Sequence, residues 1–421
     1  MDYPQRRRLT WFAIAILSMP AVGLFGYSLL HPAPQVKAGA VAVTYRTDKP
    51  ATSETPRSPW VMQESGTTAG LRGIYSVDGK VVWASGTGGT VLKTIDGGEH
   101  WTKCAVPDAA TDGATMDFRG VQAWDDDTAI IMSAGPGEKS RLYKTTDGCK
   151  TWAMLLKNSE RKGFYDAFWL NAIYGEGMLV GDPVNDQFTV LETQDGGLTW
   201  KRDKSRSLQL HGLSLGAFAA SNTSIARAIR TSGNMKGPGT DFFPGFVTGG
   251  KSGTFLFERW EGPSKTKARY GRKLPGWPPP DWNRRAVPLT AGTESSGAFS
   301  VALRDTGSPC DDCGFGTYWV PVVVGGDYAK PTESSGTAAW SSDGGWNWTS
   351  ATKPPHGFRS AVQWSEDLKA WITVGTNGSD ISRDDGKTWT PLDDGNWNAL
   401  SLPFVVGPNG RIARIALLPK K

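Results

Sequence analysis

Three observations predict that this 421-residue chain folds as an all-β, seven-bladed β-propeller of four-stranded antiparallel blades. An octet of the form Ser/Thr-x-Asp-x-Gly-x-x-Trp occurs five times, short apolar runs alternate with turn residues, and the two ends of the chain supply complementary parts of one blade. The 52 glycines, 27 prolines and 19 tryptophans suit short strands joined by tight turns better than helices. A net charge of +5, with basic residues scattered among acidic ones, predicts no nucleic-acid partner.

Residues 1–30 are predicted to be a targeting segment. Three arginines at 6–8 precede an uncharged apolar run over 9–30, which is long enough to span a bilayer. The small residues at 38–40 offer a cleavage site, so a cleaved signal peptide and a retained membrane anchor both stay open. In either case the arginines keep the N-terminus cytoplasmic and send the rest across the membrane. We therefore expect an exported, periplasmic or otherwise extracytoplasmic protein.

Two further regions follow the targeting segment. Residues 31–57 are rich in Pro, Ala, Thr and Ser and are predicted to be a flexible linker. Residues 58–421 are predicted to form the propeller.

The five octets give the spacing of the blades. Their aspartates and tryptophans are Asp96 with Trp101, Asp147 with Trp152, Asp195 with Trp200, Asp343 with Trp348, and Asp384 with Trp389. Successive tryptophans lie 51, 48, 148 and 41 residues apart, and the long step is close to three units of about 49. Two blades within that step have therefore lost the octet.

The strands of each blade can be identified by their apolar runs. In blade one they cover 71–76, 81–85, 91–94 and the residues from 101 onward. Blade four lacks the octet but has two strands within 246–258 and an outer strand over 282–287. Blade five begins near 297, has its second strand near 322–325, and ends in the octet at Trp348.

The ends of the chain predict how the ring closes. The last residues contain three strands, at 399–402, 404–407 and 411–416, and the fourth strand of that blade is missing. Residues 60–63 precede blade one and stand where the last strand of a blade should be. Pairing of this strand with the C-terminal blade would close the ring and remove exposed sheet edges. Six complete blades and one shared blade make seven.

Each octet falls at the turn between the third and fourth strands of its blade. We expect its Asp to accept backbone N–H bonds, the fifth-position Gly to allow a positive φ, the Ser or Thr hydroxyl to bond locally, and the Trp to cover the sheet. The competing interpretation, an Asp nucleophile or metal ligand, is disfavoured because a catalytic group is not needed five times. The sequence thus predicts no catalytic residue, no metal site and no cofactor.

The four cysteines all lie in the part of the chain that is expected to be exported, where disulfides can form. Cys310 and Cys313 form a CxxC motif that could staple a loop, act as a redox pair or provide half of a metal site. The staple is favoured because no second CxxC and no nearby His complete a metal site. Cys104 with Cys149 is a second expected pairing.

The octets resemble the BNR or Asp-box repeat. Together with the stretch VWASGTGGTVLKTIDGGEHW and the closing VGPNGRIAR, the sequence resembles the photosystem II stability/assembly factor family over roughly residues 58–418. The resemblance implies a seven-bladed propeller without catalytic activity that binds and assembles other proteins on the far side of a membrane. Asp boxes also occur in sialidases and other glycan-active enzymes, so a glycan-active hydrolase is the alternative. A photosystem partner is not implied, because many relatives occur in bacteria without photosynthesis.

Candidate ligand-binding residues lie on the face opposite the octets, where the loops into the first strands meet the loops after the second strands. Near the starts of the first strands stand Arg72, Arg119, Tyr165, Asp166, Glu294 and Arg359. The loops after the second strands add Glu138, Lys139, Asp182, Lys251, Asp327 and Lys330. We expect a monomer whose partner is a membrane-associated protein, with an anionic or glycan ligand as a further expectation.

Two interpretations of the three arginines stay open. If they converge on the axis of the ring, they could hold a carboxylate or phosphate by bidentate bonds. Alternatively, each arginine pairs with an acidic residue of a neighbouring blade, such as Asp166 or Glu294, and locks the ring. The six residues also match a sialidase site superficially, although Arg72 lacks the sequence environment of that site.

Overall fold

The computed structural model describes residues 58–171, 175–202, 207–226, 245–259, 282–310 and 316–416. Strands dominate these residues, and the helical elements among them are two short 3-10 turns, η1 (Gly113–Thr115) and η2 (Gly137–Lys139). No helix in the described part of the chain is long and apolar enough to cross a membrane. The predicted targeting segment, the linker and Cys313 lie outside the described residues, as does the side chain of Cys310, so the CxxC staple stays a prediction.

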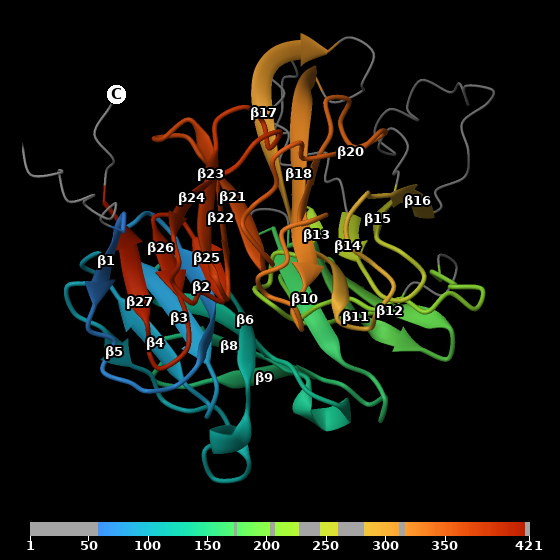
Figure 1. Cartoon of the computed structure of the whole chain (residues 1–421). Coiled ribbons are helices and arrows are strands. Elements are labelled where there is room, and N and C mark those ends of the chain that lie inside the picture. Colours follow the sequence, from blue (N-terminus) through green and yellow to red (C-terminus); the bar gives the residue numbers. More distant parts are fainter. Residues whose placement is uncertain are drawn as a thin grey trace, which may run out of the picture. The chain divides into compact units, whose positions relative to one another are not determined.

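The strands form seven antiparallel sheets, one for each predicted blade (Figure 1). Blade one contains, from the inside outward, β2 (Leu71–Ser76), β3 (Val82–Gly86), β4 (Val91–Thr94) and β5 (Thr102–Lys103). Blade two contains β6 (Phe118–Ala123), β7 (Thr128–Ser133), β8 (Arg141–Thr146) and β9 (Ala153–Lys157). Blade three contains β10 (Tyr165–Leu170), β11 (Gly177–Val184) and β12 (Gln187–Thr193). Blade four contains β13 (Ile225–Ala226), β14 (Gly245–Thr248), β15 (Phe255–Arg259) and β16 (Trp282–Ala286).

The remaining blades complete the ring. Blade five contains β17 (Ser296–Cys310), β18 (Gly316–Asp327), β19 (Ala338–Trp340) and β20 (Thr349–Ser350). Blade six contains β21 (Ala361–Ser365), β22 (Ala370–Gly375), β23 (Gly378–Ser382) and β24 (Thr390–Asp393). Blade seven contains β25 (Ala399–Ser401), β26 (Phe404–Val406), β27 (Ile412–Ile415) and β1 (Trp60–Gln63). The seven-bladed propeller is confirmed. The step between Trp200 and Trp348 contains one blade without an octet, blade four, and not two, because blade five with its long strands β17 and β18 fills the rest of the step and carries the octet at Trp348.

Blade three departs from the expected four strands within the described residues. Its outer edge pairs with β12 only at two isolated bridges, Glu192 with Lys201 and Gln187 with Gln209. The N–H groups of Glu192 and Lys201 each donate to the other residue's carbonyl oxygen at 2.8 Å. The outer partners of the two bridges, Lys201 and Gln209, lie before and after residues 203–206, which the structure does not describe.

The ring closes through the N-terminal strand, as the sequence predicts. β1 runs antiparallel to β27, with Trp60 opposite Ile415 and Gln63 opposite Ile412. Figure 1 shows the blue β1 beside the red β27. Trp60 is 5% exposed, and its indole Nε1 donates to Ser379 of blade six at 2.9 Å. The closing strand is therefore held by blade six as well as by its own sheet.

The hydrophobic core is divided into seven clusters, each between two adjacent blades. On β7, Ala129 and Ile131 pack toward blade one, while Ile130 and Met132 pack toward blade three. Successive side chains of a strand point to opposite faces, and here both faces are buried. For that reason such strands consist of continuous apolar runs in the sequence instead of alternating apolar and polar residues.

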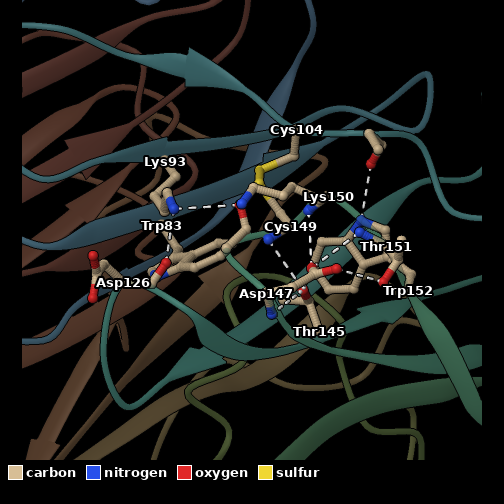
Figure 2. Close-up of a disulfide and its surroundings, with 12 residues drawn as sticks. Trp83, Lys93, Cys104, Asp126, Thr145, Asp147, Cys149, Lys150, Thr151 and Trp152 are labelled. Carbon is tan, nitrogen blue, oxygen red and sulfur yellow. Dashed lines mark hydrogen bonds between the residues drawn. A yellow bond between two sulfur atoms is a disulfide. The ribbon is translucent and has the colours of Figure 1, made fainter.

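The octets form the expected turns, shown for blade two in Figure 2. The Thr145 hydroxyl donates to Asp147 at 2.8 Å, and the backbone N–H groups of Lys150 and Thr151 donate to the same carboxylate oxygen at 3.0 Å. The Thr151 hydroxyl and these backbone donors favour the charged carboxylate and lower the pKa of Asp147 to about 2. The other four octets repeat the bond from the first-position hydroxyl and a backbone N–H bond to the aspartate.

The octet tryptophans cover the seams between blades, which refines the expectation that they cover their own sheet. Each one packs into the cluster shared with the preceding blade; they are Trp101, Trp152, Trp200, Trp348 and Trp389. The octet is therefore both a turn and a contact that positions one blade against the next.

A disulfide joins Cys104 to Cys149 and confirms that expected pairing (Figure 2). Cys104 follows β5 of blade one, and Cys149 occupies the fifth position of the octet in blade two, so the bond connects neighbouring blades. Both cysteines are buried. Cys149 has a φ of 67°, which explains why the other four octets have glycine at this position.

Loss of this disulfide is expected to lower the free energy of unfolding by about 2–4 kcal/mol. Cys104→Ala should show the full loss, because Cys149 then keeps its positive φ without its bond. Cys149→Gly should cost about 1 kcal/mol less, because glycine removes the left-handed strain. Denaturant unfolding of both variants, with and without reductant, measures the difference, and a wild-type protein that reductant leaves equally stable would contradict the prediction.

Candidate functional site

A cavity of about 840 Å³ lies on the face where the loops into the first strands meet the loops after the second strands. We call it the channel-mouth cavity. It is lined from all seven blades, for example by Arg72, Asp166 and Asn398 of blades one, three and seven. A smaller cavity of about 260 Å³ continues along the same first strands and is lined by residues such as Ile74 and Val301. The two cavities follow the central channel of the ring.

Four residues of the channel-mouth cavity stand at the same irregularity of the first strand. The register between the first and second strands shifts on either side of Arg72, Arg119, Asp166 and Phe299, so each is left out of the ladder. Such a β-bulge places one extra residue in a strand and redirects its side chain. All four of these residues line the cavity.

The structure corrects the expected equivalence of Arg359 with Arg72. In blade one, Leu71 lies opposite Gly86, and Arg72 is the next residue. In blade six, Arg359 lies against Gly375 in the way that Leu71 lies against Gly86, so Ser360 is the residue equivalent to Arg72. Since a shift of one residue turns a strand side chain to the other face, Ser360 lines the cavity and Arg359 does not.

Arg359 is fully buried inside blade six. Its Nε donates to Asp380 at 2.7 Å, one Nη donates to the same carboxylate, and the other donates to the Phe358 carbonyl and the Asn377 side chain, each at 2.6 Å. His356 contacts both Arg359 and Asp380. The acidic partner thus comes from Arg359's own blade and not, as the lock interpretation proposed, from a neighbouring one.

Tyr165 also points away from the cavity. It is 2% exposed and packs with Met132, Phe168 and Leu179 in the cluster between blades two and three. It occupies the position equivalent to Leu71, directly before the bulged Asp166. At the start of each of these first strands, a buried residue that packs between blades is therefore followed by a residue that faces the cavity.

Arg72 and Arg119 share a single carboxylate. Arg119 Nε donates to Asp117 Oδ2 at 2.8 Å, and Arg72 Nε lies 3.6 Å from Asp117 Oδ1. At that distance Arg72 Nε has no hydrogen-bond partner among the described residues, and neither does Asp117 Oδ1. Two guanidinium groups with one carboxylate give this part of the cavity an excess of positive charge.

The adjacent part of the cavity, on blade three, is acidic. Asp166 is 2% exposed, and burial together with the nearby Asp182 carboxylate raises the pKa of Asp166 well above its usual value. Burial also raises the pKa of Asp182, to about 6, although the N–H of Ala217 donates to it at 3.1 Å. Burial thus favours the protonated form of both carboxyl groups.

Glu294 lies at the rim of the cavity. Its side chain is 79% exposed and forms an ion pair with Lys251 at 2.7 Å. Both groups reach solvent, so the pair contributes little to stability. Of the six candidate residues, the structure brings together Arg72, Arg119, Asp166 and Glu294, and separates Tyr165 and Arg359 from them.

Aromatic residues form a wall that the sequence analysis missed. Phe218 and Phe299 stack with their ring centroids 3.8 Å apart, and Phe358 meets Phe299 edge-on at 4.7 Å. Both Phe218 and Phe299 end a Gly-Ala-Phe triplet, at 216–218 and 297–299, and this repeat was the signal that could have identified them. Asp117, two residues before Arg119, was missed as well.

The residues of a sialidase-like site are not assembled. Such a site needs a third arginine and an accessible tyrosine, whereas Arg359 and Tyr165 are buried elsewhere. The described residues contain one group with the spacing of a metal site, Asp96, Glu99 and His100, at the octet of blade one. Asp96 already accepts the His100 backbone N–H at 3.0 Å as part of the octet turn, and the group is open to solvent.

Comparison with known proteins identifies the fold. No protein-family model and no curated protein match this chain. A solved structure of YCF48 bound to D1 peptide superposes with a TM-score of 0.50 at 17% identity, covering 86% of this chain and 97% of that one. YCF48 from Cyanidioschyzon merolae gives a TM-score of 0.51 at 18% identity, covering 85% and 98%. The chain thus resembles a photosystem II assembly factor in fold, in agreement with the resemblance of its sequence motifs.

Proposed function

We propose that this protein is an exported, non-catalytic propeller that binds a segment of a partner protein in the channel-mouth cavity and assists assembly of a complex at the outer side of a membrane. The observation that carries the proposal is the arginine pair, Arg72 and Arg119, which faces a cavity of about 840 Å³ with only one carboxylate between the two side chains.

The chemistry of this pair suits a carboxylate of the partner. A guanidinium has five N–H donors in a planar fork, and the donors that Asp117 does not use can bind a second carboxylate. A cavity of this size can take several side chains or a chain terminus. One of the similar structures, YCF48 bound to D1 peptide, is a peptide complex of a protein with this fold.

Two features support export. The arginines and the apolar run of residues 1–30 have the composition of a targeting segment. The buried disulfide between Cys104 and Cys149 suits an oxidising compartment. Proteinase accessibility of the propeller in intact cells would test this location.

A glycan-active hydrolase is the second candidate function, because Asp166 and Asp182 place two carboxyl groups in one cavity. It ranks second because Asp166 is 2% exposed and the arginine triad is absent from the described residues. Turnover of aryl glycosides by the purified protein at ordinary enzyme rates would reverse this order.

Arg119→Ala is expected to weaken partner binding about 10- to 150-fold, the loss that corresponds to a charge-assisted bond of about 1.5–3 kcal/mol. In the assay, the immobilised wild-type protein is used to capture a partner from detergent-solubilised membranes. The captured partner is then titrated against each variant. Arg383→Ala, which removes an exposed arginine from the octet of blade six, is the matched control and should bind normally. Both variants should melt close to wild type, since the Arg119 ion pair is partly exposed. Normal binding by Arg119→Ala would exclude the arginine pair as the site.

A further inference from the structure

We infer that Asp166 and Asp182 form a second subsite of the channel-mouth cavity, which takes a cationic group of the bound peptide, a lysine or arginine side chain or a free amino terminus. The inference rests on the proposed function, because the ligand is the same peptide whose carboxylate the arginine pair would hold.

Local backbone irregularities aim both carboxyl groups at this place. Asp166 is the bulged residue of β10, between Tyr165 and Ala167. Asp182 lies where the pairing of β11 with β12 shifts, between Gly181 and Val184. Both line the channel-mouth cavity, and Asp182 is close enough to act on the Asp166 carboxyl electrostatically.

Within the described part of the chain no basic side chain lies within ion-pair distance of these carboxyl groups, although Arg119 acts on Asp166 electrostatically and favours its charged form. Asp166 Oδ2 is buried without a hydrogen-bond partner, and the neighbouring backbone at Asp182 and Ala219 only partly offsets the effect of burial on the pKa of Asp166. No ion pair joins Asp166 or Asp182 to a basic side chain of the described residues. A buried carboxylate without a partner is costly, so the site needs either a proton or a cation from outside.

The shape of the surroundings favours an organic cation over a bare metal ion. Phe164 and Phe218 line the cavity beside the carboxyl groups and can cover the aliphatic stem of a long basic side chain. A primary ammonium carries three N–H donors. It can therefore donate to both carboxyl groups, which receive few hydrogen bonds from the protein. A divalent cation would need more oxygen ligands than this pair provides.

Binding at this subsite should be linked to protons. The charged and titratable groups that line the same cavity are Arg72, Arg119, Lys162, Asp166, Asp182, Glu294 and Tyr328. Burial raises the pKa of Asp182 to about 6 and also raises the pKa of Asp166, so burial favours a protonated subsite and a bound cation would displace that proton. A cation binds the charged carboxylates, and therefore its contribution should increase as the pH rises through about 6.

The test uses a library of short synthetic peptides with free terminal carboxylates, presented to the full-length protein. We expect wild type to select Lys or Arg at one position. Replacing that residue by norleucine should weaken binding about tenfold or more, the loss of a charge-assisted bond. The ratio of the two affinities should be larger at a pH of about 8 than at about 5.

Variants separate the subsite from the arginine pair. Asp166→Asn and Asp182→Asn should bind the selected peptide and its norleucine form equally, while Asp126→Asn, an exposed aspartate beyond the cavity, should behave as wild type. Asp182→Asn provides the comparison if Asp166→Asn unfolds. If binding requires the terminal carboxylate of the peptide and Arg119 but no basic residue, the inferred subsite is wrong and the proposed function still holds. If wild type retains no peptide, both are wrong.

Discussion

Arg359→Ala is expected to lower the free energy of unfolding by about 3–5 kcal/mol, the cost of breaking a buried ion pair. The variant leaves the Asp380 carboxylate, which is itself buried, without the two guanidinium donors that it receives in the wild-type protein. Partner binding should stay normal, because Arg359 does not line the channel-mouth cavity. Chemical denaturation measures the first effect and titration with the captured partner measures the second.

The pH dependence of this variant gives a second check. The hydrogen bond to Asp380 raises the pKa of His356, and Arg359 acts in the opposite direction. A raised histidine pKa stabilises the fold at low pH, and that stabilisation is lost as the pH rises through the folded-state value. Without Arg359, a protonated His356 becomes the remaining charged partner of Asp380. The loss of stability should therefore be smaller at a pH of about 5.5 than at about 8.

Arg119→Ala is the matched control for both measurements, because Arg119 faces the cavity and its ion pair is partly exposed. The two substitutions should give opposite results: Arg359→Ala loses stability and Arg119→Ala loses binding. A variant Arg359→Ala that unfolds like wild type but binds weakly would show that Arg359 belongs to the site after all.

Deletion of residues 58–65 is expected to have the largest effect on stability. It removes β1, exposes the edge of β27, and takes Trp60 out of the seam between blades six and seven. Loss of one buried tryptophan alone costs about 3–5 kcal/mol. An uncovered strand edge also promotes association with other chains. We expect a lower melting temperature together with concentration-dependent aggregation, measured by calorimetry and light scattering.

Two controls accompany the deletion. Removal of residues 1–50 should leave the unfolding of the propeller unchanged, because the closing strand remains. Among point variants, Trp60→Ala should be strongly destabilising, whereas Val61→Ala should be nearly neutral, since Val61 is 57% exposed. A protein without residues 58–65 that is as stable and as monomeric as wild type would mean that β1 does not close the ring.

The blade count and the ring closure could be predicted from the sequence because they depend on local signals. Five octets mark turns whose hydrogen bonds are made within eight residues, as around Asp147. Three strands at the C-terminus leave one blade a strand short, and the run at 60–63 supplies the strand that is missing. Blade three shows the limit of such counting, since its outer edge is reduced to bridges at Lys201 and Gln209 in the described residues.

The candidate site could be predicted only in part, because it depends on single-residue register. The sequence places Arg72, Arg119 and Arg359 at similar distances from the next strand, yet only the first two stand at bulges. No local pattern distinguishes a bulged residue from its neighbour. The aromatic wall formed by Phe218 and Phe299 likewise joins residues that are 81 positions apart in the sequence and meet only through the packing of neighbouring blades.

The sequence by itself determined the all-β class, the seven blades, the octet turns and the strand that closes the ring, since these follow from apolar runs and turn chemistry over a few consecutive residues. Only the tertiary structure decided that Ser360 faces the cavity while Arg359 is buried against Asp380, and that Asp166 lies in the cavity with an unpaired oxygen. The physical reason is the two-residue period of a strand: a shift of one residue exchanges the buried face for the face that lines the channel, and packing between blades sets that shift.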